Sequence, residues 1–211
     1  MDRYPLSHHL GWHFHLCRGV IAPRLALVSE VQYDPGMSFL PDHKLSEYGE
    51  RLIQPFRQEC VEPASIDLHL SDEFLVPDIS NVRCVDLDDP IDFMRRVEVG
   101  IEGYVLHPGE FILGVTEERV TLPANIVGKI EGKSSLGRLG LMVHVTAGFI
   151  DPGFRGPVTL EMKNLLQVPI VLRPGKKICQ IAFALMDAPA LNPYKGRYQD
   201  SKGVVASRYG E

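Results

Sequence analysis

Several common sequence signals are missing from this chain of 211 residues. Its four cysteines, Cys17, Cys60, Cys84 and Cys179, form no C-x-x-C pair, which argues against a disulfide framework and against a zinc knuckle. No apolar run approaches the roughly 18 residues of a membrane span, and the N-terminus has no continuous hydrophobic segment of the signal-peptide type. We therefore expect a protein of the reducing cytoplasm without a membrane partner.

Positive charge is also scarce. The formal net charge is -5 at pH 7, whereas sequence-independent binding of nucleic acid requires a broad positive surface. We therefore expect no nucleic-acid partner, and any bound phosphates should be few and locally held. With 45% hydrophobic and 23% charged residues, the chain has the profile of one globular domain with enough residues for a substantial core.

Residues 1–36 differ from the rest of the chain. They contain the only tryptophan, Trp12, and show no sustained hydrophobic period; they also hold four of the eight histidines, His8, His9, His13 and His15. A shared metal ion is one interpretation of this histidine spacing. We favour coincidence and expect an N-terminal extension, either a flexible arm or an incorrectly assigned start.

The remainder predicts a mainly β fold. The segment PDHKLSEYGERLIQPF predicts one short helix, with Leu45, Leu52 and Ile53 on one face and its end at Pro55. From Ser65 onward, short β-rich runs are separated by proline and glycine turns every ten or so residues, which indicates a barrel or a double-sheet roll.

Alternation within one of these runs orients a carboxylate. In GPVTLEMKN, the apolar residues Val158, Leu160 and Met162 fall on one face, while Thr159, Glu161 and Lys163 fall on the other. Glu161 is therefore expected opposite the apolar face, either as a solvent-facing residue that aids solubility or as a functional group.

The stretch EGKSSLGR looks like a phosphate loop without being a Walker A loop. The Walker pattern needs a second glycine five residues before Gly132, where this chain has Val127. Small residues beside Lys133 and Arg138 nevertheless suit a polyphosphate, because they let backbone N–H groups approach while the two side chains supply charge. A charged surface turn is the alternative.

Several motifs together resemble a known family. From about Met37 the chain is similar to the dCTP deaminase branch of the dUTPase superfamily, on the blocks PASIDLHL, EGKSSLGRLGLMVHVTAGFIDPGFRGPVTLE, LRPGKKICQIAF and NPY in that order. The resemblance implies a distorted β-barrel or jelly-roll with one or two short helices, in a homotrimer with nucleotide sites between subunits. It divides the chain into residues 1–36, a barrel domain of residues 37–190 and a tail of residues 191–211 that closes over the nucleotide.

The reaction implied by the resemblance is hydrolytic removal of the 4-amino group of dCTP without zinc. The chain also lacks the H-x-E and P-C-x-x-C signature of the zinc deaminases. We expect Mg²⁺ to arrive on the substrate triphosphate rather than in a protein cage.

The resemblance also assigns roles by position. Glu161, in the T-L-E block, becomes the general base that activates water toward C4 of the cytosine. Asp151 would hold the 3′-hydroxyl of the deoxyribose, and Thr159 would line the base pocket. Other positions match the triphosphate site (Lys133, Ser134, Ser135, Leu136, Gly137, Arg138), the platform beside the pyrimidine (His144, Val145, Thr146, Ala147) and nucleotide contacts from later segments (Gln180, Tyr194).

Two segments bear on which product is released: the C-terminal tail and the turn at Gly148 and Phe149. Family tails read K-Y-x-x-Q-x-G, whereas this tail has Arg197 at the lysine and Ser201 at the glutamine, which puts the tail contacts in doubt. Gly148 and Phe149 resemble the bifunctional members that also cleave the triphosphate to dUMP and diphosphate, while members reading TAHRID stop at dUTP. We favour dUMP; a deaminase releasing dUTP, a dUTPase and a nucleotide-sensing binding protein stay open, with dTTP as a candidate feedback ligand.

Overall fold

The computed structural model describes residues 38–210, so the expectations for residues 1–36, including their histidines and Cys17, lie outside the described residues. Strands dominate, as predicted. The strands are β1 (Ser38–Phe39), β2 (Ile53–Gln54), β3 (Val61–Glu62), β4 (Ser65–Pro77), β5 (Met94–Glu98), β6 (Tyr104–Leu106), β7 (Phe111–Thr121), β8 (Ile126–Gly132), β9 (Leu141–Met142), β10 (Phe149–Ile150), β11 (Arg155–Asn164), β12 (Ile170–Leu172) and β13 (Lys177–Leu185). The helices of this part are α1 (Asp42–Leu52), α2 (Ser134–Gly137) and a 3₁₀ turn (Gln58–Cys60).

Helix α1 is amphipathic and short. It buries Leu45, Gly49 and Leu52, with Asp42 in its first turn and Arg51 in its last, the arrangement that the helix dipole favours. The predicted extension through Ile53 is wrong, because Ile53 is extended and begins β2. The chain leaves the helix just before Pro55, whose ring disfavours helical geometry in the residue that precedes it. Neither this helix nor α2 is long and apolar enough to cross a membrane.

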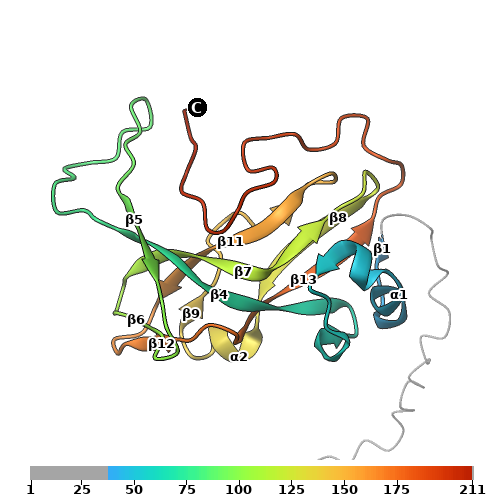
Figure 1. Cartoon of the computed structure of the whole chain (residues 1–211), viewed down its shortest axis with the longest axis horizontal. Helices are drawn as coiled ribbons and strands as arrows, with labels where there is room; N and C mark the ends of the chain where they lie inside the picture. Colours follow the sequence, from blue (N-terminus) through green and yellow to red (C-terminus); the bar gives the residue numbers. More distant parts are fainter. Residues whose placement is uncertain (1–37, 211) are drawn as a thin grey trace, which may run out of the picture. The chain divides into compact units, whose positions relative to one another are not determined.

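The long strands form one antiparallel sheet in the order β10-β8-β13-β4-β7-β11-β9, and β12 pairs separately with β6 (Figure 1). β4 links the two halves of the sheet because it pairs with β13 through its first residues and with β7 and β5 through its later ones. Residues 186–210 follow β13 and contain no helix or strand. This C-terminal tail runs back toward β11 (Figure 1).

One face of the sheet carries the core. Leu160 and Met162 of β11 are fully buried there with Phe74 of β4 and Phe183 of β13. The approach is close: a Cβ at Gly114 of β7 would lie 2.4 Å from Cε of Met162, so this strand needs a glycine where the methionine packs. The alternation predicted for β11 is confirmed, since Thr159, Glu161 and Lys163 are half-buried between buried neighbours.

Candidate active site

A cavity of about 480 Å³ lies against the polar face of β11, a size typical of small-molecule sites. Its walls come from β7, β10, β11, the segment 91–94 and the C-terminal tail. It brings together part of the predicted site, namely Ala147, Phe149, Asp151, Thr159, Glu161, Tyr194 and Ser201. These residues come from segments that are separated in sequence, and the fold brings them around one cavity.

Glu161 is braced by the turn before β10. Its Oε2 accepts hydrogen bonds from the backbone N–H groups of Val145, at 2.9 Å, and Thr146, at 3.2 Å. Its Oε1 accepts no hydrogen bond from any residue between 38 and 210, which leaves that oxygen available to water or a ligand. The turn that sequence reasoning placed beside a pyrimidine thus positions the carboxylate at the cavity wall.

Gly148 sits where a side chain does not fit. Its carbonyl accepts a hydrogen bond of 2.6 Å from the N–H of Ile130. A Cβ at this position would lie 2.9 Å from the carbonyl oxygen of Ile130 and 3.3 Å from Cε1 of His144. Nδ1 of His144 is buried without a hydrogen-bond partner among the residues that the structure describes. Any larger residue at 148 must therefore shift the backbone of this turn away from Ile130.

The turn after β10 docks the start of the tail. The N–H of Tyr194 donates to the carbonyl of Pro152 at 2.8 Å, and the Tyr194 ring lies 5.8 Å from that of Phe154. Gly153 has a φ of +90°, and a Cβ there would lie 2.6 Å from Pro193, so only glycine suits this contact. Asp151 and Tyr194 consequently share one edge of the cavity.

The rest of the tail is fastened across β11. Nε2 of Gln199 donates to the carbonyl of Gly153 at 2.9 Å, while its Oε1 accepts from the N–H of Arg155 at 3.0 Å. Val204 is buried in a small cluster with Leu75 and Val115. The predicted tail thus lies along the cavity.

The two tail positions at which this chain departs from the family pattern have different surroundings. Ser201, at the position of the family's glutamine, lines the cavity, while the tail amide that bonds to the turn after β10 belongs to Gln199, two residues earlier. Arg197, expected to take the place of a nucleotide-binding lysine, does not line the cavity; its guanidinium donates to the carbonyl of Arg208 at 2.5 Å.

The residues predicted to bind the triphosphate lie outside this cavity. Ser134, Ser135 and Arg138 are exposed around α2 and do not line the cavity. Lys133 donates to the carboxylate of Asp67. Gln180 accepts from Ser65 Oγ at 2.9 Å and donates to the carbonyl of Gly132 at 3.3 Å. One chain therefore gathers the predicted base and sugar residues in one place and the predicted phosphate residues in another.

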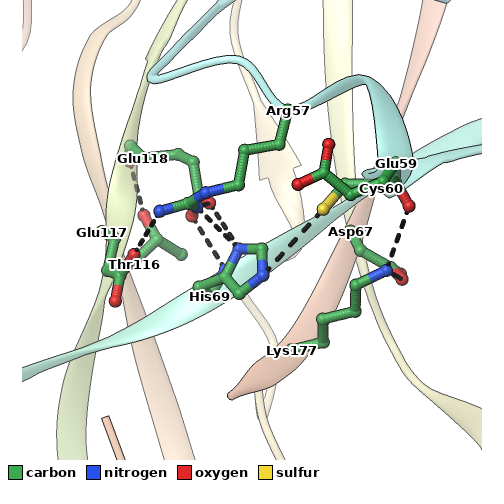
Figure 2. A network of polar contacts seen from close by, with 9 residues as sticks. All are labelled: Arg57, Glu59, Cys60, Asp67, His69, Thr116, Glu117, Glu118 and Lys177. Carbon is green, nitrogen blue, oxygen red and sulfur yellow. Dashed lines mark hydrogen bonds and ion pairs between the residues drawn. The ribbon is translucent and has the colours of Figure 1, made fainter. Parts of the chain in front are cut away.

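One further polar cluster has the donor atoms for a metal. Ligand atoms of His69, Glu117 and Glu118 lie within 4.8 Å of one another. Figure 2 shows the Arg57 guanidinium beside both carboxylates, donating to Glu117 at 2.8 Å and also to the buried Glu118. The positive charge of this cluster is thus already supplied by an arginine, which a metal ion would have to displace.

The chain is similar to known proteins over most of its length. A family model described as dCTP deaminase-like matches residues 40–186. A protein of Beutenbergia cavernae named dCTP deaminase, dUMP-forming, is 47% identical over 167 residues, covering 76% of this chain and 87% of that protein. A Halorubrum lacusprofundi protein named dCTP deaminase is 40% identical over 173 residues, covering 77% of this chain and 85% of that protein.

Among solved structures, a 2′-deoxycytidine 5′-triphosphate deaminase from Agrobacterium tumefaciens matches with a TM-score of 0.57 and 25% identity. The match covers 71% of this chain and 48% of that chain, so this chain spans about half of its length. The family match, the identity to its members and the shared fold lead to one conclusion: the chain belongs to the dCTP deaminase-like family.

Proposed function

We propose that the protein hydrolyses the 4-amino group of dCTP and then cleaves the triphosphate, releasing ammonia, dUMP and diphosphate. The observation that carries this proposal is Glu161, a carboxylate held at the cavity wall by two backbone N–H groups with one oxygen left open. The relative from Beutenbergia cavernae, at 47% identity, bears the name of the dUMP-forming enzyme.

Glu161 would act on the water that attacks C4 of the cytosine. It takes a proton as the C4–O bond forms, and it returns that proton as the C4–N bond breaks and ammonia leaves, so dCTP and one water give dUTP and ammonia. The cavity wall is otherwise rich in aromatic and aliphatic groups, including Phe111, Phe149 and Phe154. Such a wall would pack against the ring of the base and reduce its contact with water beside the carboxylate.

The second half of the site would come from another subunit. Ser134, Ser135 and Arg138 are exposed and away from the cavity of their own chain, as expected of groups that serve a neighbour. We propose a homotrimer in which the α2 region of one subunit holds the triphosphate of a nucleotide whose base lies beside Glu161 of the next. Mg²⁺ would arrive on the triphosphate.

The cleavage of the triphosphate should depend on Gly148. Gly148→His places a side chain where a Cβ alone meets a backbone carbonyl at 2.9 Å, so the turn must move and the neighbouring Phe149 and Asp151 with it. We expect this variant to raise the ratio of dUTP to dUMP among its products by about tenfold or more. Ion-exchange chromatography of quenched reactions measures that ratio, and an unchanged ratio would remove Gly148 from the second step.

A time course with dCTP and Mg²⁺ tests the proposed function as a whole. We expect dUMP and diphosphate to appear together without accumulation of dUTP. Accumulating dUTP would reduce the activity to deamination alone. If dCTP is not consumed while added dUTP is hydrolysed, the protein is a dUTPase; if neither nucleotide is consumed, nucleotide sensing becomes the leading function.

A further inference from the structure

A buried carboxylate, Asp67, lies beside the predicted triphosphate block, outside the cavity that contains Glu161. Asp67 is on β4, where Ile66 and Leu68 point into the core and Asp67 and His69 share the opposite face. Its side chain is 1% exposed. A charged aspartate is almost never buried to this extent unless it is paired, because removing its charge from water is costly.

Each oxygen of Asp67 bonds to a different lysine. Oδ1 accepts from Nζ of Lys133, which directly follows β8, and Oδ2 lies 3.1 Å from Nζ of Lys177, the first residue of β13 (Figure 2 shows the second pair). The hydrogen bond to Asp67 raises the pKa of Lys177 above its ordinary value, so this ammonium stays charged throughout the neutral range. Asp67 thus holds two cations that come from different strands.

Both lysines retain N–H donors that could bind a ligand. Their side chains are 22% and 38% exposed. An ammonium has three N–H donors; Asp67 takes one from each lysine, and Lys177 gives a second to the carbonyl of Glu59 at 3.4 Å. Asp67 offsets one of the two ammonium charges, and the carboxylate of Glu62 also acts on Lys177. Ser134, the residue after Lys133, is exposed at the start of α2.

The strand register also places Gln180, a predicted nucleotide contact, next to Asp67. Gln180 of β13 is paired with Asp67 of β4 on one side and with Glu131 of β8 on the other. The side chain of Gln180 donates to the carbonyl of Gly132, the residue before Lys133. Strands β4, β8 and β13 therefore bring Lys133, Gln180 and Lys177 together around one carboxylate.

We propose that Lys177 is a further triphosphate-binding residue and that Asp67 is a positioning residue that holds Lys133 and Lys177 side by side. The inference rests on the proposed function, since it names groups that bind the phosphates of that substrate. Two ammonium groups fixed before the ligand arrives lose less side-chain freedom on binding than two free lysines would. The buried carboxylate of Asp67 would then do more than neutralise a lysine: it would fix the positions of two phosphate-binding ammonium groups.

Lys177→Met tests the proposal, with Lys176→Met as the matched control. Lys176 is the adjacent, exposed lysine, and among the described residues its side chain makes no hydrogen bond or ion pair with Asp67 or Gln180. We expect Lys177→Met to raise the KM for dCTP and the Kd for inorganic triphosphate about tenfold, with kcat within about twofold of the wild type and Lys176→Met unchanged. The affinity for deoxycytidine, which has no phosphate, should not change in either variant.

Asp67→Asn tests the positioning role in a double-mutant cycle with Lys177→Met. We expect Asp67→Asn to raise the same KM and Kd, and the two substitutions together to cost less than the product of their separate effects, because they break one shared contact. Thermal unfolding monitors the fold of each variant, and Lys177→Met decides the question if Asp67→Asn does not fold.

The two proposals fail in different ways. If the wild type consumes dCTP but Lys177→Met matches Lys176→Met in KM and in triphosphate affinity, the Asp67 cluster is only a structural ion-pair network. If the wild type does not consume dCTP, the proposed function is wrong, and the inference that depends on it is wrong as well.

Discussion

Glu161→Gln should lower the rate of dCTP deamination by a factor of about 10² to 10⁴, the range that a positioned general base contributes. The substitution keeps the size of the side chain and an oxygen that can still accept the N–H groups of Val145 and Thr146. It removes the group that takes a proton from water. Steady-state kinetics give the rate, and calorimetric titration with dCTP and Mg²⁺ should give an affinity close to that of the wild type.

Lys163→Gln is the matched control for this variant. Lys163 lies two residues along β11 on the same face as Glu161 and does not line the cavity. It should leave both rate and affinity unchanged. A Glu161→Gln enzyme that keeps most of its turnover would show that another group activates the water, and loss of dCTP binding in that variant would show a positioning role instead.

Two impaired variants should restore activity to each other if the nucleotide lies between subunits. Arg138→Ala alone should weaken both dCTP binding and turnover, because it removes a cation from the triphosphate block. In mixed trimers of Glu161→Gln and Arg138→Ala chains, some sites receive an intact Glu161 from one subunit and an intact Arg138 from its neighbour. Each mixed trimer has one complete site in three, so the activity of the isolated mixed trimers should return to about a third of the wild-type value.

Co-expression with two affinity tags isolates the mixed oligomers, and light scattering gives their mass. Glu161→Gln co-expressed with a chain carrying both substitutions is the control, since it contains no complete site and should stay inactive. No recovery in verified mixed oligomers would place the whole site within one chain, and a monomeric mass would exclude the trimer.

The main features of the fold are predictable because they depend on local pattern. Alternation along β11 is enough to predict that Glu161 lies opposite Leu160 and Met162, and the structure confirms that placement. The same kind of pattern extends α1 one residue too far, to Ile53, since an apolar residue fits a helix face and a strand equally well. Pro55 is the signal that the chain has already left the helix.

The site is harder to predict because it depends on contacts between distant segments. Matching by position points to Ser201 and Arg197 in the tail, while the hydrogen bonds to the turn after β10 are made by Gln199. The same period-two pattern that reveals Glu161 also puts Asp67 opposite Ile66 and Leu68 in SIDLHL, a signal from which this aspartate could have been found. No sequence pattern reveals that Lys133 and Lys177, 44 positions apart by their residue numbers, share that aspartate.

Conversion of dCTP in ¹⁸O-labelled water, followed by mass spectrometry of the products, tests the central claim most directly. Hydrolysis at C4 followed by cleavage of the triphosphate predicts dUMP with one ¹⁸O at the carbonyl oxygen on C4 of uracil. A second ¹⁸O should enter dUMP if water attacks the α-phosphorus, or diphosphate if it attacks the β-phosphorus. dUMP with an unlabelled base, or dUTP as the final product, would contradict it.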